Sequence, residues 1–251
     1  MKHIIRITST LLISLGLATT AQAASYSFST ADSPLYGTNP ANFWSSDLNQ
    51  GWWSSGYDNK NDNPNIVVGD STNYLYRNFF TFDLSDLSLA PDEVIVSASF
   101  SGFTHTIEVA GGLFETVEFF DVSTDAGTLN YNVAANPTIY EDLGTGKSYG
   151  SRDFYASESN TNFSMALNDN AIADITTAQN GWFSIGGMLT TLDNSGQPEW
   201  VFAFSNEDVA PYKLDIETQI SAVPLPAALP LYGAGLAVLG FVGWRKKRKT
   251  A

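Results

Sequence analysis

Short runs of β-branched and aromatic residues recur along the middle of the chain, and turn-forming residues separate them. Runs of this length and composition are typical of β-strands, and several of them at regular spacing predict an antiparallel sheet protein. The final run, 212–220, alternates apolar and polar residues. The expected strands are residues 77–84, 94–103, 104–110, 113–122, 182–192, 200–205 and 212–220.

A single segment of this region, 169–179, has the pattern of a helix. Asn168 is a suitable N-cap, Ile172 and Ile175 fall on one face, and Asn180-Gly181 suits the end. The predicted fold class is therefore all-β: an antiparallel β-sandwich, jelly-roll-like, with one short helix. We expect residues 24–222 to form this one domain.

The N-terminus has the three parts of a secretory signal peptide. A basic start is followed by the apolar residues 7–17, a run too short to cross a bilayer. Small residues then flank a cleavage point, so residues 1–23 are expected to be removed by signal peptidase, with an uncleaved anchor helix as the alternative. The residues of that cleavage site are Ala21, Ala23 and Ala24.

The C-terminus carries a second hydrophobic segment, 225–244, with a basic cluster directly after it. A helix of this length, at ~1.5 Å per residue, just crosses the hydrocarbon core of a membrane. We therefore expect a single transmembrane helix whose basic end stays in the cytoplasm. The residues expected to stop transfer are Arg245, Lys246, Lys247, Arg248 and Lys249.

A short motif lies at the start of that segment and is made of Val223, Pro224, Leu225, Pro226 and Ala227. The motif, the glycine-rich apolar stretch and the basic end together resemble the PEP-CTERM class of bacterial sorting tails, in its VPLPA variant, over residues 223–251. The resemblance implies an exosortase-like protease that cuts near the prolines. It implies a Gram-negative source, transient anchoring in the inner membrane, and a destination at the cell surface or in the extracellular matrix. An ordinary single-pass anchor is the alternative.

Acidic and basic residues are distributed unevenly between the expected domain and the two ends of the chain. All 26 acidic residues lie in 24–222, which holds five basic residues, so this part has a net charge of −21. Such a surface repels nucleic acid and anionic lipid, and the sequence therefore predicts no nucleic-acid partner. Solubility explains the charge, and a salty habitat or binding of divalent cations are the alternatives.

Composition also restricts the chemistry. The chain has no cysteine, which excludes disulfides, thiolate metal sites and cysteine nucleophiles. Of its two histidines, His3 lies in the expected signal peptide, so a multi-histidine zinc site is excluded, together with most histidine-based catalysis.

Two stretches, 77–85 and 94–100, resemble the start of secreted jelly-roll modules that are often linked to polysaccharide binding. An aromatic cluster interleaved with amides and hydroxyls is the candidate site for such a ligand, because sugar rings stack on flat aromatic faces. Burial of these rings in the core is the alternative. The candidate ligand-binding residues are Trp44, Trp52, Trp53 and Tyr57.

Gly111-Gly112 predicts a tight hairpin. In that register Glu108 lies opposite Glu115, and His105 lies opposite Glu118. Close carboxylates suit a shared proton, a glycosidase or a calcium site, and a solvated face is the alternative.

Two further segments point to turns. Residues 144–148 match only the end of a phosphate-binding loop and predict a turn. Residues 58–63 are a weak calcium candidate and are expected to form a solvated Asx turn.

The function expected from the sequence is that of an exported, non-enzymatic surface or matrix protein associated with exopolysaccharide. No catalytic residues and no cofactor are expected, with Ca²⁺ as the one candidate ion. A polysaccharide-active hydrolase or lyase that uses paired carboxylates is one alternative, and a purely structural matrix component is another.

Overall fold

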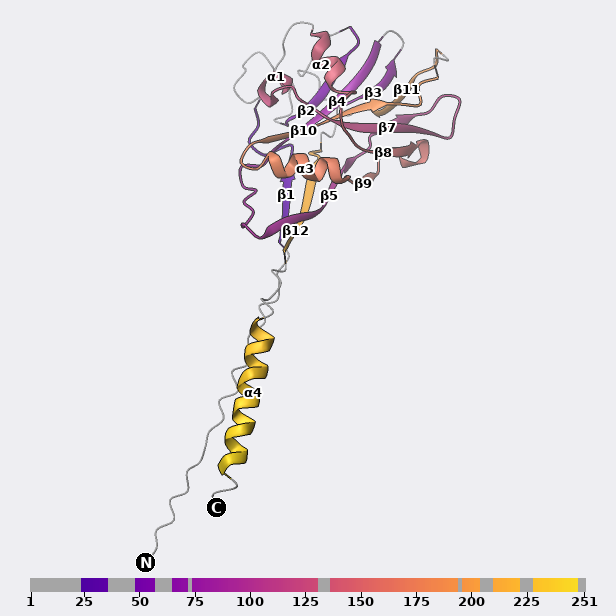
Figure 1. Ribbon diagram of the computed structural model, residues 1–251. Helices are drawn as coiled ribbons and strands as arrows, with labels where there is room; N and C mark the ends of the chain where they lie inside the picture. The colour runs from indigo at the N-terminus through magenta and orange to yellow at the C-terminus, as the bar shows by residue number, and fades with distance from the viewer. Residues whose placement is uncertain are drawn as a thin grey trace, which may run out of the picture.

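The protein is described by a computed structural model in the ranges 24–35, 48–56, 65–71, 74–130, 136–193, 196–203, 210–221 and 228–247. Its body consists of antiparallel strands in two sheets with few short helices (Figure 1). This confirms the all-β, sandwich-like fold class expected from the sequence.

The first sheet has four strands. Its order places the last strand of the domain between the first strand and β5. In sheet order the strands are β1 (Ser25–Ser29), β12 (Lys213–Ile220), β5 (Glu93–Phe103) and β9 (Asn162–Ala166).

The second sheet has eight strands, and β2 (Gln50–Ser54) pairs with β4 outside its main path. In sheet order the others are β6 (Thr106–Glu108), β11 (Glu199–Ala203), β3 (Val68–Ser71), β4 (Tyr74–Asp83), β10 (Trp182–Leu189), β7 (Phe114–Asp121) and β8 (Ser148–Tyr155).

Short helices cover parts of the sheets. Helix α3 (Asp169–Thr177) contacts β5 and β8, and the Asn168 side chain caps it by accepting hydrogen bonds from the backbone N–H groups of Asn170 and Ala171. This confirms the helix expected over 169–179, although the domain has further short helices that the sequence did not predict. The remaining helical segments are α1 (Ala126–Asn130), α2 (Pro137–Asp142), the 3₁₀ turn η1 (Ala156–Glu158) and α4 (Ala228–Lys247).

An aromatic cluster fills the main core. Phe100 of β5 lies at its centre, with ring centroids 4.8 Å from Phe80, 5.4 Å from Phe119 and 5.6 Å from Phe163. Tyr212 stacks on Phe100 at 5.7 Å, and its buried hydroxyl donates a hydrogen bond to the carbonyl of Phe103. Because these rings come from both sheets, their packing joins the sheets.

The expected strands form with shifted ends, and the sequence missed several elements. Strands β1, β2, β3, β8 and β9 were not expected, and neither were helices α1 and α2. Strand β8, for example, follows the turn at 144–147 and contains polar residues at most outward positions. Its pairing with β7, rather than its own composition, makes it a strand.

The predicted hairpin at Gly111-Gly112 is wrong. Strand β6 pairs with β11, whereas β7 pairs with β10 and β8. Gly111 has a positive φ of 71°, and a Cβ there would lie 2.6 Å from a carboxylate oxygen of Asp193. The absence of a side chain at Gly111 therefore allows Asp193, in the loop after β10, to approach the backbone closely. The glycine does not form a two-residue turn.

Helix α4 begins three residues after the start of the predicted apolar segment. Within the ranges that the structure describes, no helix combines the length and the apolarity needed to cross a membrane. The transmembrane helix expected over 225–244 stays a prediction. Pro230, Tyr232 and several glycines interrupt its apolar residues, and α4 ends in basic ones.

The two ends of the sheet body lie together. Ala24 and Thr218 exchange backbone and side-chain hydrogen bonds, and the backbone N–H of Ser221 donates to the carbonyl of Asp92. The signal peptide with Ala21 and Ala23, and the motif at 223–227, fall outside the described residues. Their processing therefore stays a prediction.

Replacing Phe100 by Ala should lower the free energy of unfolding by about 3–5 kcal/mol, because it removes a ring that is fully buried among other rings. Urea unfolding followed by tryptophan fluorescence measures this change. The matched control is Leu113→Ala, since Leu113 is 81% exposed and should change stability little. An equal effect of the two variants would contradict the described core.

Candidate functional site

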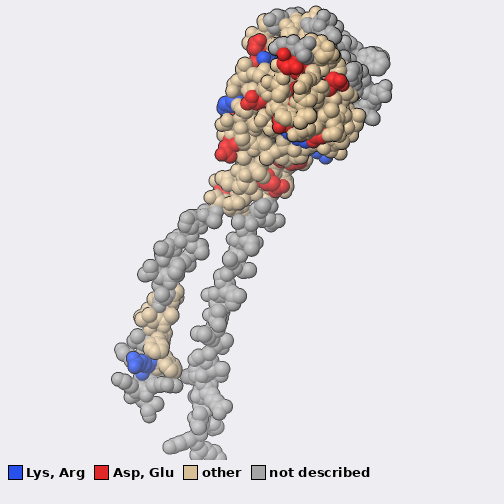
Figure 2. All heavy atoms as spheres, turned by 90° about the vertical axis from the view of Figure 1, so that its right-hand side faces the viewer, with Lys and Arg blue, Asp and Glu red and all other residues tan. Residues whose placement is uncertain are grey.

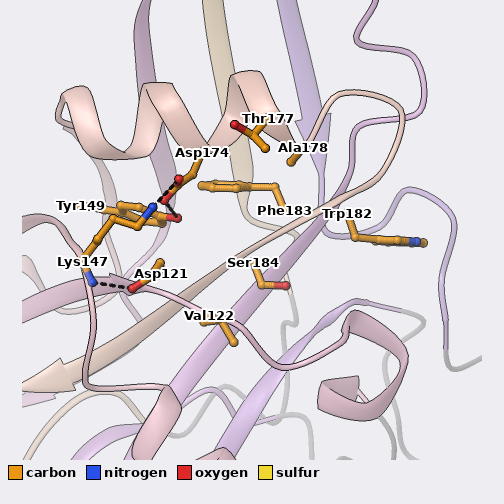
Figure 3. A pocket seen from close by; sticks show the side chains of 10 residues that line it. All are labelled: Asp121, Val122, Lys147, Tyr149, Asp174, Thr177, Ala178, Trp182, Phe183 and Ser184. Atoms are coloured by element: carbon orange, nitrogen blue, oxygen red, sulfur yellow. Dashed lines mark hydrogen bonds and ion pairs between the residues drawn. The ribbon is translucent and has the colours of Figure 1, made fainter.

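A cavity of about 260 Å³ lies beside α3, between the end of β7, the start of β8 and the first residues of β10 (Figure 3). Its lining combines charged groups, hydroxyls and aromatic rings. The lining residues are Asp121, Val122, Lys147, Tyr149, Asp174, Thr177, Ala178, Trp182, Phe183 and Ser184.

The turn before β8 builds one wall of this cavity. Gly146 has a φ of 99°, and a Cβ there would lie only 2.2 Å from Oδ1 of Asp121. The absence of a side chain lets the backbone N–H of Lys147 donate to that oxygen at 2.5 Å. The segment 144–148 is thus a turn, as the sequence predicts, and it orients the lysine toward α3.

Asp174 of α3 connects the charged groups of the cavity. Its carboxylate forms an ion pair with Nζ of Lys147 and accepts a hydrogen bond from the Tyr149 hydroxyl at 3.0 Å (Figure 3). The hydrogen bond that Nζ of Lys147 donates to Asp174 raises the pKa of Lys147. Burial, followed by the hydrogen bond to Asp174, raises the pKa of Tyr149 far above its usual range. The tyrosine therefore stays protonated and acts as a donor.

Strand β10 supplies the opposite end of the cavity. Its alternation buries Phe183 next to Tyr149, with ring centroids 5.5 Å apart. Trp182 is half-buried, and in Figure 3 its indole points away from Tyr149, at the far end from Lys147. Ser184 is buried and exchanges a hydrogen bond with Thr81. The cavity therefore has a charged end and an aromatic end.

The polar groups that line the cavity are hydrogen-bonded to one another. Asp121 and Asp174 both accept hydrogen bonds from Lys147, and Asp174 accepts another from Tyr149. The ion pair and the aromatic ring offer polar and flat contacts to a small ligand.

The aromatic residues singled out in the sequence lie elsewhere. Trp52 and Trp53, on β2, are 8% and 0% exposed, and Trp52 packs edge-on against Tyr76 at 5.1 Å. Trp53 belongs to a second apolar cluster beneath α2. Neither indole presents a free face for a sugar ring. Both tryptophans are buried, which was the alternative to ligand binding. Trp44 and Tyr57 lie outside the described residues.

The carboxylate pair expected from the sequence, Glu108 with Glu115, does not form. Glu108 is exposed and lies opposite Trp200 of β11, whereas Glu115 is buried. Glu115 accepts hydrogen bonds from the Thr191 hydroxyl and the backbone N–H of Ala110. The prediction that Glu108 faces Glu115 is wrong because β6 and β7 do not pair.

The carboxylate that lies near Glu115 belongs to Glu199, a buried glutamate of β11. Glu199 is 1% exposed, lies near Glu115 and accepts a hydrogen bond from the backbone N–H of Asp193 at 3.1 Å. Its second oxygen, Oε2, is buried and has no hydrogen-bond partner among the described residues. Desolvation is the main cause that raises the pKa of Glu199 to about 7, and the nearby carboxylates of Asp193 and Glu115 add to it.

The predicted pair of His105 and Glu118 does not form either. His105 is buried with a positive φ of 50°, and its ring packs against Phe103. Glu118 lies between Met188 of β10 and Ser151 of β8.

A metal site requires several ligating side chains close together. Among the described residues, no group of three His, Cys, Asp or Glu side chains is arranged to hold a metal ion. The calcium candidate at 58–63 lies outside them.

Two comparisons with known proteins give no relatives: no family model matches the chain, and no curated protein matches it. A search of solved structures finds similarity to a chain of the Mud crab tombus-like virus, solved by cryo-EM at 3.3 Å. The match has 12% sequence identity and a TM-score of 0.26, and it covers 92% of this chain and 99% of the viral one. A score this low carries no argument about fold or function.

Glu199→Gln should stabilise the protein at pH 8 and leave its stability nearly unchanged at pH 5. A raised pKa means that the folded state keeps a proton that the unfolded chain loses between about pH 4.5 and 7, so stability falls as pH rises through that range. The glutamine keeps the neutral form at both pH values. Chemical denaturation at pH 5 and pH 8 measures the difference.

The control is Glu118→Gln on β7, a partly exposed glutamate outside the buried pair. A Glu199→Gln variant that is less stable than the wild type at pH 8 would contradict the raised pKa.

Proposed function

We propose that this chain is an exported, non-enzymatic protein of the bacterial surface or extracellular matrix, whose β-domain binds a sugar unit of a polysaccharide in the cavity beside α3. Signal peptidase removes residues 1–23, and an exosortase-like protease processes the tail at 223–227. The domain then remains at the surface or in the matrix.

The observation that carries the binding proposal is the make-up of the cavity. The half-buried indole of Trp182 offers a flat apolar face, and Thr177 and the ion pair of Lys147 with Asp174 offer donors and acceptors for sugar hydroxyls. A volume of about 260 Å³ accommodates one ring-sized polar group.

The charge of the domain limits the choice of polysaccharide. The described face in Figure 2 carries scattered acidic residues and few basic ones. The domain as a whole has a net charge of −21, and long-range repulsion disfavours strongly anionic polymers. A neutral polysaccharide is therefore the expected ligand.

The sorting proposal rests on the tail motif and on the order of its parts. The motif at 223–227 follows directly on the sheet body, which ends with β12 at Ile220. A protease that cuts in this segment would leave every strand of the described body intact.

We also propose that the two sheets form a variant of the jelly-roll fold. The support is the order of the four-stranded sheet, in which the first and last strands of the domain are neighbours at one side.

A purely structural matrix role is the second candidate, and one observation favours it. The outward face of the four-stranded sheet is rich in polar side chains, with Asp215 and Glu217 accepting hydrogen bonds from serines of β1. The outward serines of this face are Ser25, Ser27, Ser29, Ser97, Ser99 and Ser101.

A glycan array with the mature chain, followed by calorimetry on the best neutral ligand, tests the binding proposal. Trp182→Ala should weaken binding at least tenfold, because the variant loses the stacking face, while the melting temperature stays within about 3 °C. The matched control is Trp200→Ala, a half-buried tryptophan of β11 outside the cavity, which should bind normally. Binding by Trp182→Ala at wild-type strength would refute the cavity as the site, and the absence of any glycan ligand would favour the structural role.

Mass spectrometry of the protein recovered from a culture of its source tests the processing proposal. The expected product begins at Ala24 and ends within or just before 223–227. Recovery of the chain with both ends intact would refute export and sorting by these signals.

A further inference from the structure

The first residue after the expected signal-peptide cleavage point is held firmly in the structure. The backbone nitrogen of Ala24 donates to Oγ1 of Thr218 at 3.3 Å, and the carbonyl of Ala24 accepts the backbone N–H of Thr218 at 2.9 Å. Thr218 is fully buried in β12. The position of the Ala24 nitrogen is therefore fixed by the sheet.

A carboxylate lies one hydroxyl group beyond that nitrogen. The Thr218 hydroxyl donates a short hydrogen bond to Oε1 of Glu93, at the start of β5. The other oxygen of Glu93 accepts the backbone N–H of Ala90 at 3.0 Å. These two hydrogen bonds, that of Thr218 first, lower the pKa of Glu93, so the carboxylate is charged at neutral pH.

Further acidic residues lie close to Ala24 and Glu93 along these strands. Glu217 of β12 accepts a hydrogen bond from the Ser25 hydroxyl, and Asp92 precedes Glu93. Lys213 is at the other end of β12, opposite Ser29. The segment that follows Ser221, residues 222–227, contains no charged residue. The charged side chains nearest to Ala24 on these elements are therefore all acidic.

We propose that Thr218 and Glu93 form a preformed acceptor for the N-terminal ammonium group that signal-peptide cleavage creates at Ala24. The inference rests on the proposed export, because that cleavage supplies the amine. Hydrolysis of the Ala23–Ala24 peptide bond consumes one water, leaves a carboxylate on Ala23 and gives Ala24 an amine that takes up a proton. The uncleaved amide has one N–H and no charge, whereas the ammonium has three donors and a positive charge next to Glu93.

The consequence is a fold that becomes more stable when its leader is removed. Strand β1 is at the edge of the four-stranded sheet and pairs with β12 alone among the described strands. An ion pair at Ala24 secures the outer end of this strand. The processed chain should therefore hold β1 more tightly than the precursor does.

The test uses residues 24–251 released from a cleavable fusion partner, so that Ala24 carries a free amine whether or not cells process the leader. The comparison is the same chain with an acetylated N-terminus. At pH 6 the free amine should raise the melting temperature by about 2 °C, as expected for one partly exposed ion pair. An unperturbed α-amino group has a pKa of about 7.7–8.0, and a neighbouring carboxylate raises it. The gain should therefore be present below about pH 7.7 and disappear as the pH rises through the higher folded-state value.

Two variants separate this ion pair from general charge effects. Glu93→Gln should remove the difference between free and acetylated chains, whereas the matched control Glu217→Gln should keep most of it. Equal melting temperatures of the free and acetylated wild-type chains at pH 6 would overturn the proposal, and so would a difference that survives Glu93→Gln.

A measurement on the wild-type chain keeps the proposal testable if a variant does not fold. Titration of ¹⁵N-labelled Ala24 by NMR should give the α-amine a pKa above 8, and an ordinary or lower value would overturn the acceptor. Mass spectrometry of the exported protein reports separately on cleavage. A failed acceptor and a failed export signal are thus distinguishable.

Discussion

The packing of aromatic rings between the two sheets is the interaction on which the rest of the structure depends. Phe100 contacts rings from β4, β7 and β9, and Tyr212, directly before β12, stacks on it. The Tyr212 hydroxyl satisfies its hydrogen bond at the carbonyl of Phe103 inside the core. Since an unpaired buried hydroxyl is costly, this contact fixes where the last strand enters the sheet.

That entry point connects the core to both ends of the domain. Strand β12 lies between β1 and β5, so the first and last segments of the domain are neighbours although almost the whole domain separates them in sequence. The proposed acceptor for the Ala24 amine arises from this arrangement, because Thr218 comes from β12 and Glu93 from β5. The same pairing places Ala24 beside Thr218, close to the end of β12.

Three carboxylates of the domain have different surroundings. Glu199 is desolvated, and its pKa is raised to about 7, whereas two hydrogen bonds lower the pKa of Glu93. Asp174 is paired with a lysine and a tyrosine in the cavity. The two glutamates thus differ in their pKa, because each has its own burial and its own donors.

The sequence by itself determined the fold class, the α3 segment with its Asn168 cap and the turn at 144–148, because these depend on local periodicity and backbone preference. Tertiary structure alone decided which strands pair, and so it placed Glu115 beside Glu199 instead of Glu108. It also buried Trp52 and Trp53 and left Trp182 at the cavity, a residue that the sequence showed only as the start of a strand. Composition records that an aromatic residue is apolar, but only the packing of distant strands decides whether its face meets the core or a ligand.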